Sequence, residues 1–408
     1  MSTTDRLIIE SLRTGVPNPA VVRTMGSNQN ELLDKCTQLL ENTRAQTSRP
    51  SNGLVFFGDF GAGKSHALQT LAETARQRGF IVSEGAISRN LQLADAKQLL
   101  SLLLNQTTSS SHPEDAFPLA VADFLQADHS HGRFAQWAAT EHSKGRLSEH
   151  FKLIAENLGR VSYGSPEFEL LMDFFHGIGA APQVRQITGR RPTGSLPGTT
   201  RPWQTVRFLS RLLVEAGHAG WLVLLDELEL IRLVGVSPTI GRAKSYVALG
   251  NWMGQGDLGT TNGLAVIGCM TTGYAEQQIL PGPESANELS VIPQKLLWSA
   301  SPELAPLAEK ALKFIVDNSR SKEHRLVRPS DPFLRELQYR LKESYERAFG
   351  CRVSEKLIAN TEFEPIRVQI RRWIVQWDLE RHHIDTNLSV QALHQNLTGD
   401  DDSDDVDS

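Results

Sequence analysis

A glycine-rich octapeptide between a short apolar run and an amphipathic stretch constrains this chain more than any other feature. Leu54 to Phe57 is the apolar run, and Gly58-Asp59-Phe60-Gly61-Ala62-Gly63-Lys64-Ser65 follows it directly. Apolar residues then recur at helical spacing from Ala67 to Ala75, and Phe80 to Ser83 has the pattern of a further strand. Strand, loop, helix and strand in this order predict a βαβ unit within an α/β fold that contains a parallel sheet.

The octapeptide matches the pattern G-x-x-x-x-G-K-[ST] at every defined position. Its glycines let backbone N–H groups turn toward a phosphate, while Lys64 adds a positive charge and Ser65 a hydroxyl for Mg²⁺. The N-terminus of the following helix contributes a partial positive charge. We therefore expect ATP and Mg²⁺ as cofactors. The residues expected to bind the nucleotide are Gly58, Asp59, Phe60, Gly61, Ala62, Gly63, Lys64, Ser65 and His66.

A pair of carboxylates follows another apolar run. Trp221 to Leu225 predicts a buried strand, and Asp226-Glu227 comes directly after it. In phosphoryl transfer an Asp in this position holds Mg²⁺, here together with Ser65, and a second group orients the attacking water. We assign the second function to Glu227, and we count Lys64 as catalytic because it contacts the β- and γ-phosphates. A small-molecule kinase uses the same kind of loop, but the second carboxylate favours water as the acceptor.

Composition excludes several classes of protein. The 408 residues carry a net charge of −5, which excludes a protein that coats DNA by bulk charge alone. The polar N-terminus predicts no signal peptide, and no apolar run approaches the ~18 residues of a membrane span. Three distant cysteines, Cys36, Cys269 and Cys351, argue against a disulfide framework or a zinc cluster and favour a reducing cytoplasm.

The charge is unevenly distributed along the chain. Residues 399–408 hold six Asp and no Lys or Arg, so we expect this end to be disordered. Phe174 to Val214, by contrast, has no Asp or Glu in 41 residues. This arginine segment predicts a local positive field for the phosphate backbone of DNA. Its basic residues are Arg185, Arg190, Arg191, Arg201, Arg207 and Arg211.

Pattern and composition suggest four regions. They are an N-terminal helical segment at 1–50 that is expected to pack on the nucleotide site, an ATPase core at 51–300 with a helical insertion at about 95–214, a helical C-terminal domain at 301–390 that is lid- or winged-helix-like, and a disordered acidic tail at 391–408. Within the insertion, Gln183 to Trp203 is rich in Gly, Pro and Arg and predicts a loop.

The C-terminal region contains a helical pattern with both basic and aromatic residues. One interpretation is a basic amphipathic helix that presents Arg371, Arg372 and Arg381 to a partner. The other interpretation, which the spacing favours, is a core helix. Its inward residues would be Ile370, Trp373, Ile374 and Trp377.

These features together resemble the BrxD-like P-loop ATPases of BREX-type phage-defence loci. The resemblance covers residues 5–100 and 205–275 most clearly. It is carried by the following stretches: a short N-terminal helix with Gly15-Val16-Pro17, the octapeptide Gly58 to Ser65, Gly79-Phe80-Ile81-Val82-Ser83-Glu84, Leu222-Val223-Leu224-Leu225-Asp226-Glu227-Leu228-Glu229 and Lys244-Ser245-Tyr246. It implies an AAA+-like core related to initiator ATPases and a prokaryotic defence context. It also implies a helicase or other DNA-acting protein as partner. The sequence leaves the oligomeric state open: a ring-forming ATPase would assemble into a nucleotide-dependent homo-oligomer, and a monomeric switch would not.

The resemblance adds expectations for further site residues. ATPases of the AAA+ type place a polar residue on a strand between the two motifs, and here the strand Leu264 to Met270 ends in Thr271-Thr272. We choose Thr271, with Thr272 as the alternative. The family tends to read Thr-Gly-Thr at this point, whereas this chain reads Cys269-Met270-Thr271-Thr272-Gly273. The segment from Val16 to Gly26 is expected either to line the adenine pocket or to form a packing turn.

An arginine that reaches the γ-phosphate would complete such a site. Arg242 is our first choice because it lies in a helix-like stretch between the strand that ends at Asp226 and the strand Leu264 to Met270, with Lys244 nearby. Arg232 and Arg367 are the other candidates, the latter as a lid arginine. The leading hypothesis is a Mg²⁺-dependent ATPase that acts on DNA or assembles with a DNA-acting partner. The alternative is a nucleotide-gated interaction switch with little intrinsic hydrolysis.

Overall fold

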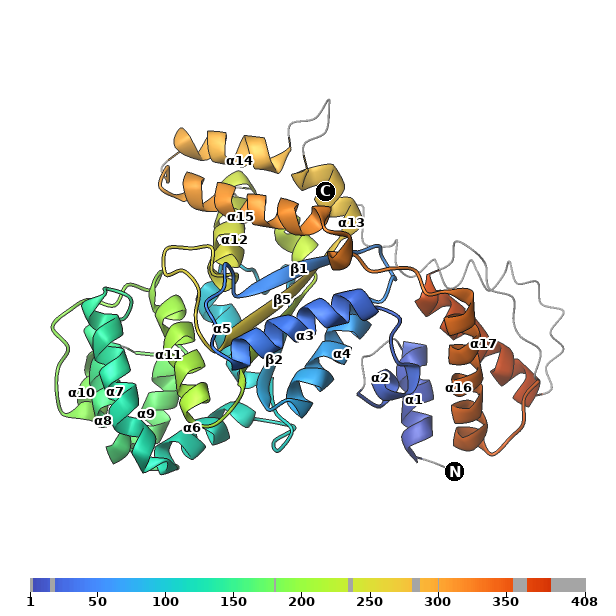
Figure 1. The fold of residues 1–408 in the computed structure, drawn as a ribbon, viewed down its shortest axis with the longest axis horizontal. Helices are drawn as coiled ribbons and strands as arrows, with labels where there is room; N and C mark the ends of the chain where they lie inside the picture. Colours follow the sequence, from blue (N-terminus) through green and yellow to red (C-terminus); the bar gives the residue numbers. More distant parts are fainter. Residues whose placement is uncertain are drawn as a thin grey trace. The chain divides into compact units, whose positions relative to one another are not determined.

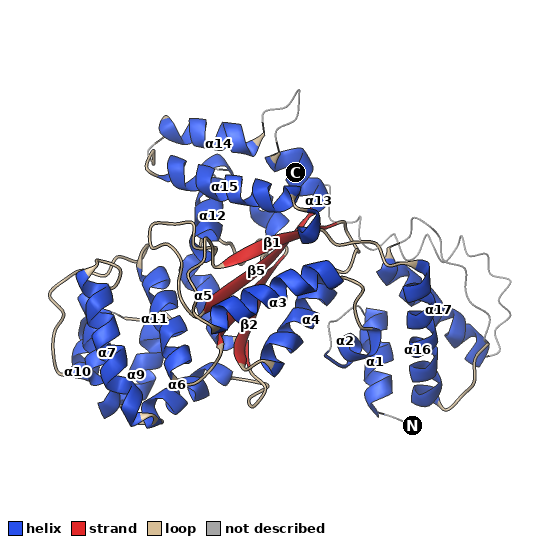
Figure 2. Ribbon diagram, viewed as in Figure 1, coloured by secondary structure: helices blue, strands red, loops and turns tan. Residues whose placement is uncertain are grey.

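The computed structural model describes residues 3–14, 19–179, 181–233, 238–280, 287–299, 301–354 and 365–382. The described residues form an α/β fold with one mostly parallel sheet, as the sequence predicts (Figures 1 and 2). The chain forms two compact units, which we call the terminal unit (1–30, 59–70 and 326–408) and the sheet unit (31–58 and 71–325). The predictions for Gly15 to Pro17 and for the acidic tail lie outside the described residues.

Five strands form the sheet in the order β1-β5-β4-β2-β3. Their bounds are β1 Gly53–Gly58, β2 Phe80–Ala86, β3 Thr107–Thr108, β4 Gly220–Asp226 and β5 Leu264–Thr271. The first four in spatial order are parallel, and β3 pairs antiparallel with β2. The strands predicted from apolar runs are confirmed, because a strand that is covered on both faces reads as a continuous apolar run.

The register brings three strand ends to one edge of the sheet. Gly58 pairs with Thr271, and Ala86 pairs with Asp226. The β4–β5 ladder ends where Leu225 pairs with Gly268, so β5 continues for three residues beyond its last β4 partner. Strand β5, which ends in Thr271, lies between β1 and β4, the two strands that precede the motifs. This is the order that the resemblance implies.

Helices pack on the strands of the sheet unit. Helix α3 (Asn30–Arg44) has the bounds that its apolar spacing predicts, with Leu32, Cys36 and Leu40 buried. Helix α5 (Ala96–Asn105) packs on β2, α11 (Arg201–Glu215) on β4 and α15 (Leu304–Arg320) on β1. The other elements that follow β4 in the sheet unit are η2 Leu228–Leu233, α12 Pro238–Trp252, α13 Thr272–Tyr274, the π-helical turn η3 Ala275–Ile279, α14 Glu288–Leu297 and η4 Lys322–His324.

The insertion between β2 and β4 is helical, as predicted. Besides α5 and α11 it contains α6 Ala116–Gln126, α7 Asp128–Ser143, α8 Glu149–Asn157, η1 Leu158–Arg160, α9 Pro166–Phe175 and α10 Ala181–Thr188. The prediction of a loop over Gln183 to Trp203 is wrong at both ends, because α10 and α11 extend into it. Val184, Ile187 and Thr188 are buried at helical spacing, and Pro202 stands in the first turn of α11, where its missing N–H costs nothing.

The terminal unit contains a small core of its own. It joins α1 (Thr3–Thr14) and α2 (Pro19–Met25) to α16 (Asp331–Phe349) and α17 (Ile366–Arg381). Ile370, Trp373, Ile374 and Trp377 are all buried, so the interpretation of α17 as a core helix is confirmed. Arg13 closes this core through an ion pair with Asp378 at 2.6 Å.

No described helix is long and apolar enough to cross a membrane.

Candidate functional site

The glycine-rich loop connects β1 directly to α4 (Lys64–Gln77). Gly61 and Gly63 have φ values of 73° and 97°, in the left-handed region that favours glycine. A Cβ atom on Gly61 would lie 2.8 Å from Cβ of Pro365, so this glycine is also required by close packing within the terminal unit. The loop therefore has the backbone that its glycines predict, and α4 begins at Lys64.

The two polar residues that begin α4 differ in exposure. Lys64 is only 7% exposed, and its Nζ lies 5.9 Å from the centre of the Phe60 ring. Phe60 is 67% exposed, whereas the loop glycines are partly covered. Ser65 is exposed at the surface of the terminal unit. A mostly covered lysine beside an accessible hydroxyl at a helix N-terminus is suited to binding an anion with its metal ion.

His66 ties the start of α4 to the end of α2. Its Nε2 lies 2.8 Å from the carbonyl oxygen of Gly26, so Nε2 carries the proton and donates it. Burial lowers the pKa of His66 below its ordinary value of 6.5, although the bond to Gly26 opposes this shift. The neutral imidazole is therefore the form that the folded terminal unit favours.

This lowered pKa predicts an acid-sensitive contribution to stability. The unfolded chain takes up a proton on His66 at higher pH than the folded chain, so the contribution is complete above pH 6.5 and declines below it. The matched variant is His66→Gln, because its side-chain amide also donates to Gly26 but does not titrate. We expect the advantage of wild type over His66→Gln in urea unfolding to decrease from pH 7.5 to 5. A pH-independent difference would contradict this prediction.

The acidic pair lies at the carboxyl end of β4. Glu227 has a φ of 58°, which is uncommon for a residue other than glycine and costs about 1 kcal/mol. Its backbone N–H donates to Oδ1 of Asp226 at 2.8 Å. The Cys269 thiol on β5 donates to the same oxygen at 2.8 Å. Two donors thus orient the Asp226 carboxylate, one from the next residue in the chain and one from the neighbouring strand β5.

The end of β5 is held by a carboxylate that the sequence analysis did not assign to the site. The backbone N–H of Thr271 donates to Oε2 of Glu229 at 3.2 Å, and Glu229 is 8% exposed. Thr271 ends β5 and Thr272 begins α13, so the two candidate threonines occupy different elements. Glu229 lies in the Asp226 to Glu229 stretch that carries the resemblance, and Cys269 lies where the chain departs from the family pattern.

The candidate arginines differ in their environment: one is paired and two are exposed. Arg242 on α12 forms an ion pair with Glu288 on α14, with 2.6 Å between Nε and Oε1. Tyr246 also donates to Glu288 and lies 2.9 Å from the hydroxyl of Tyr274. Burial and Glu288 raise the pKa of both tyrosines. Arg232 and Arg367 are exposed, the latter two residues beyond Pro365.

The donor set suits a hard cation that brings most of its own ligands. Among the described residues, no three His, Cys, Asp or Glu side chains gather into a metal cluster. Mg²⁺ usually keeps several waters and binds one or two carboxylates together with nucleotide phosphates. Asp226 at the strand end, with its Oδ1 already held by two donors, fits such an ion.

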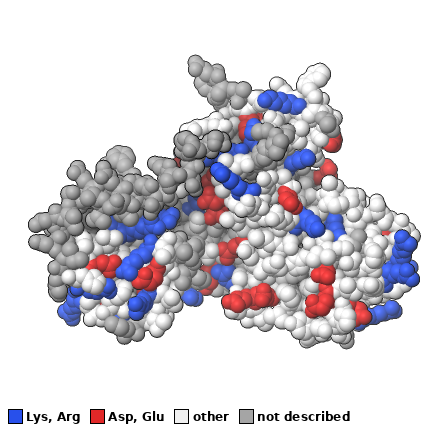
Figure 3. Space-filling view, turned by 180° about the vertical axis from the view of Figure 1, so that it is seen from behind, with Lys and Arg blue, Asp and Glu red and all other residues white. Residues whose placement is uncertain are grey.

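The arginine segment does not form one continuous basic surface. The three arginines of α11 bond within the sheet unit: Arg201 and Arg207 are buried, and Arg211 is partly buried. Arg201 donates to the carbonyls of Phe174, Ile178 and Gly179, Arg207 to Glu141 and to the carbonyls of Leu258 and Thr260, and Arg211 to Gln46 and Glu215. The other three, Arg185, Arg190 and Arg191, are exposed. Figure 3 shows that basic and acidic side chains are interspersed on the face it presents.

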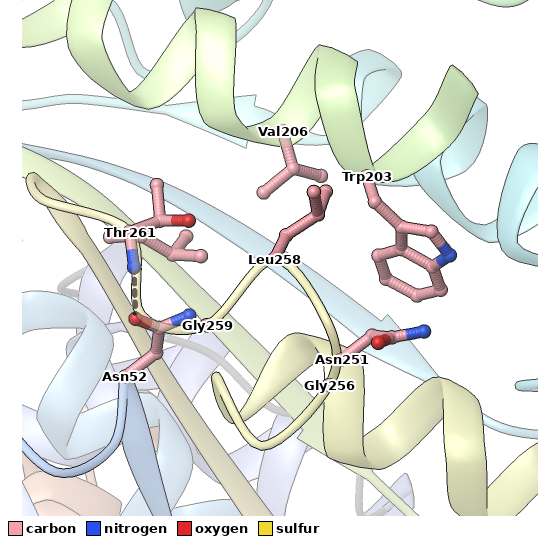
Figure 4. A pocket seen from close by; sticks show the side chains of 9 residues that line it. Asn52, Trp203, Val206, Asn251, Gly256, Leu258, Gly259 and Thr261 are labelled. Carbon is pink, nitrogen blue, oxygen red and sulfur yellow. Dashed lines mark hydrogen bonds between the residues drawn. The ribbon is translucent and has the colours of Figure 1, made fainter. Parts of the chain in front are cut away.

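A pocket lies at the opposite edge of the sheet (Figure 4). Its lining includes Asn52, just before β1, and Leu264, the first residue of β5. Oδ1 of Asn52 accepts a hydrogen bond from the backbone N–H of Thr261 at 2.7 Å. Because the motif residues follow the carboxyl ends of β1 and β4, this pocket is separate from the candidate site.

Comparison with known proteins identifies the family. No curated protein and no solved structure matches the chain. A family model does match, over residues 2–178 and 199–279, which is more than half of the chain. The unmatched stretch 179–198 contains the three exposed arginines of the arginine segment. The chain therefore belongs to the family described as BREX system ATP-binding protein BrxC/D.

Proposed function

We propose that this protein is a Mg²⁺-dependent ATP hydrolase of a BREX-type phage-defence system, built on an AAA+-like P-loop core. Its membership of an ATP-binding family supports nucleotide binding. The loop between β1 and α4 supports the P-loop assignment, since both glycines with positive φ lie where that loop needs them. The position of β5 between β1 and β4 supports the AAA+-like arrangement.

The backbone of Glu227 is the observation that carries the proposal of hydrolysis. A strained φ at a carboxylate is found where the surroundings hold the residue for a function, and here the strain follows directly on Asp226. In the proposed mechanism Asp226 and Ser65 hold Mg²⁺, Lys64 neutralises the β- and γ-phosphates, and Glu227 accepts a proton from the attacking water. Thr271 contacts the γ-phosphate or orients that water. When bound, Mg²⁺ supplies charge neutralisation on the phosphate oxygens.

Phosphate release by the purified protein tests the proposal. The protein is incubated with ATP in Mg²⁺ or in excess chelator, with and without DNA. The proposal predicts release that requires Mg²⁺. If the protein binds ATP but releases no phosphate under any of these conditions, hydrolysis is contradicted and only ATP binding remains.

One observation favours a nucleotide-gated switch as the second candidate. Arg242, our first choice for the arginine that completes the site, is engaged with Glu288 in this conformation. A γ-phosphate contact from Arg242 would require that ion pair to open, either within the chain or toward a neighbouring subunit. Sizing with ATP and Mg²⁺, with and without DNA, distinguishes the two: assembly on nucleotide supports an oligomeric ATPase, and an unchanged monomer supports a switch.

We also propose that the exposed arginines contact a nucleic-acid backbone directly or help to recruit a DNA-acting partner such as a helicase. Arg185 on α10 is exposed, and Arg190 and Arg191 follow that helix. Arg190 lies 3.4 Å from Glu156, a partly exposed pair that contributes little to stability. DNA phosphates are therefore able to replace the water around these three side chains, and also the weak pair of Arg190 with Glu156.

Charge reversal tests this contact. Replacing Arg185, Arg190 and Arg191 by Glu is expected to weaken DNA binding and to reduce the slope of log affinity against log salt by about 2 to 3. The assay is a fluorescence anisotropy titration at several salt concentrations.

A control with the same charge change separates a local contact from net charge. Lys310, Lys313 and Arg320 are exposed on α15 of the same unit. Reversal of these three is expected to leave the salt slope close to that of wild type. Equal losses in both triple variants would show that net charge alone governs binding.

A further inference from the structure

The last three residues of β5 have no partner on β4, because the β4–β5 ladder ends at Leu225 and Gly268. The turn that follows β4 contacts these residues of β5 instead. We call residues 226–229 the acidic turn. Three of its contacts with the end of β5 are those of Asp226 with Cys269, of Leu228 with Gly268 and of Glu229 with Thr271.

The first contact is the bond from Cys269 to Asp226. Cys269 is completely buried, and its Sγ lies 2.8 Å from Oδ1 of Asp226. The N–H of Glu227 reaches the same oxygen at 2.8 Å. Two donors on one carboxylate oxygen restrict rotation of the side chain, which places its second oxygen in a defined direction.

The second contact is steric. A Cβ atom on Gly268 would lie 2.5 Å from Cδ1 of Leu228, and Leu228 is completely buried. A side chain at position 268 would therefore displace the Leu228 side chain from its place against β5. Leu228 is seated against the strand in the space that this glycine leaves open.

The third contact is the bond from Thr271 to Glu229. The N–H of Thr271 donates to Oε2 of Glu229 at 3.2 Å, in the place of a strand partner. A backbone N–H that donates to a carboxylate forms a charge-assisted bond, which is about twice as strong as a neutral one. Thr271 also pairs with Gly58 of β1, so its backbone is fixed on both sides.

We propose that Glu229 and Cys269 are positioning residues: Glu229 fixes Thr271, and Cys269 fixes Asp226, so that the acidic turn and the end of β5 move as one piece. The inference rests on the proposed function for the chemistry that Thr271 and Asp226 perform. It adds that the two hydrogen bonds keep Thr271 and Asp226 in a constant geometry during turnover. Neither positioning residue contacts the substrate in this scheme.

Hydrogen exchange tests the Glu229 bond without any requirement for activity. Glu229→Leu keeps a similar volume but removes the acceptor, whereas Glu229→Gln retains an oxygen that accepts from Thr271. In the full-length protein we expect the peptide covering 268–274 to exchange at least about tenfold faster in Glu229→Leu, and close to the wild-type rate in Glu229→Gln. Peptides covering the body of β4 serve as the internal reference. Unchanged exchange at 268–274 in Glu229→Leu would overturn the proposal.

Metal affinity tests the Cys269 bond, with Mn²⁺ as a paramagnetic substitute for Mg²⁺. Loss of a group that orients a metal ligand typically costs about 10- to 100-fold in affinity. We expect Mn²⁺ affinity in the presence of a non-hydrolysable ATP analogue to fall about tenfold in Cys269→Ala and to be preserved in Cys269→Ser, which keeps a donor. Cys36→Ala is the matched control, since Cys36 is also completely buried but lies on α3. Equal Mn²⁺ affinity in Cys269→Ala and wild type would overturn this half of the proposal.

Turnover separates this inference from the proposed function. If wild type hydrolyses ATP, Glu229→Leu is expected to lower kcat by about 10- to 100-fold with KM changed by less than about threefold, as expected for a misplaced catalytic group. Glu229→Gln should restore most of kcat. If wild type does not hydrolyse ATP, the proposed function fails, while hydrogen exchange and Mn²⁺ binding still decide whether the two residues are positioning residues.

Discussion

The Glu227→Gln protein is expected to hydrolyse ATP at least about 100-fold more slowly than wild type, because a positioned general base contributes about 10²- to 10⁴-fold to rate. Glutamine has nearly the size of glutamate but does not accept a proton from water. Both residues meet the same cost for the left-handed backbone at this position, where φ is 58°. ATP affinity is therefore expected to stay within about threefold of wild type.

Steady-state phosphate release at saturating ATP and Mg²⁺ measures this effect, and titration with a labelled nucleotide measures binding. Glu276→Gln is a suitable control, because Glu276 is an exposed carboxylate on η3, shortly after the end of β5. The control should retain the turnover of wild type. Full turnover in Glu227→Gln would show that another group activates the water.

Replacing Lys64 by alanine is expected to weaken ATP binding on the order of 100-fold. The ammonium group is the positive charge that the loop offers to the β- and γ-phosphates, and a charge-assisted bond to a phosphate is worth about 1.5 to 3 kcal/mol. Because Lys64 is 7% exposed, the thermal midpoint of the nucleotide-free protein is measured alongside, to separate the loss of binding from an effect on the fold.

Calorimetric titration with ATP and Mg²⁺ measures this loss, and a thermal scan without nucleotide checks the fold. Lys310→Ala removes an exposed lysine from α15 and serves as the control. Wild-type affinity in Lys64→Ala would contradict the assignment of the loop to phosphate binding. A lowered thermal midpoint would instead mean that Lys64 is a structural residue.

Local patterns were sufficient to predict most of the elements. The amphipathic spacing of α3 predicts its bounds, and apolar runs predict the four parallel strands, because both signals depend on burial of neighbouring residues in the chain. The same holds for α17, where four inward residues are the ones expected from helical spacing. The sequence position of Asp226 and Glu227 likewise predicts a strand end.

Charge counts along the sequence were a weaker guide. The arginine segment contains six arginines and no acid, yet Arg201 and Arg207 are buried and Arg211 is partly buried. Arg201 reaches backbone carbonyls at the end of α9, and Arg207 reaches Glu141 on α7. Which side of α11 faces the core depends on packing against distant helices, so a count of charges does not reveal it.

Contacts between distant residues were not predictable from one sequence. Cys269 and Asp226 are 43 positions apart, and Thr271 and Glu229 are 42 apart. Both contacts depend on the sheet order, which places β5 beside β4. The joining of the two termini into one unit depends in the same way on the core shared by α1, α2, α16 and α17.

The identity of the nucleotide that remains bound after mixing tests the central claim most directly. Wild type and Glu227→Gln are each mixed with ATP and Mg²⁺, freed of unbound nucleotide, denatured with acid and analysed by chromatography. The proposed mechanism predicts that wild type carries ADP while Glu227→Gln carries ATP. ATP on both proteins, in equal amounts, would contradict hydrolysis by this chain and would leave it as a nucleotide-gated switch.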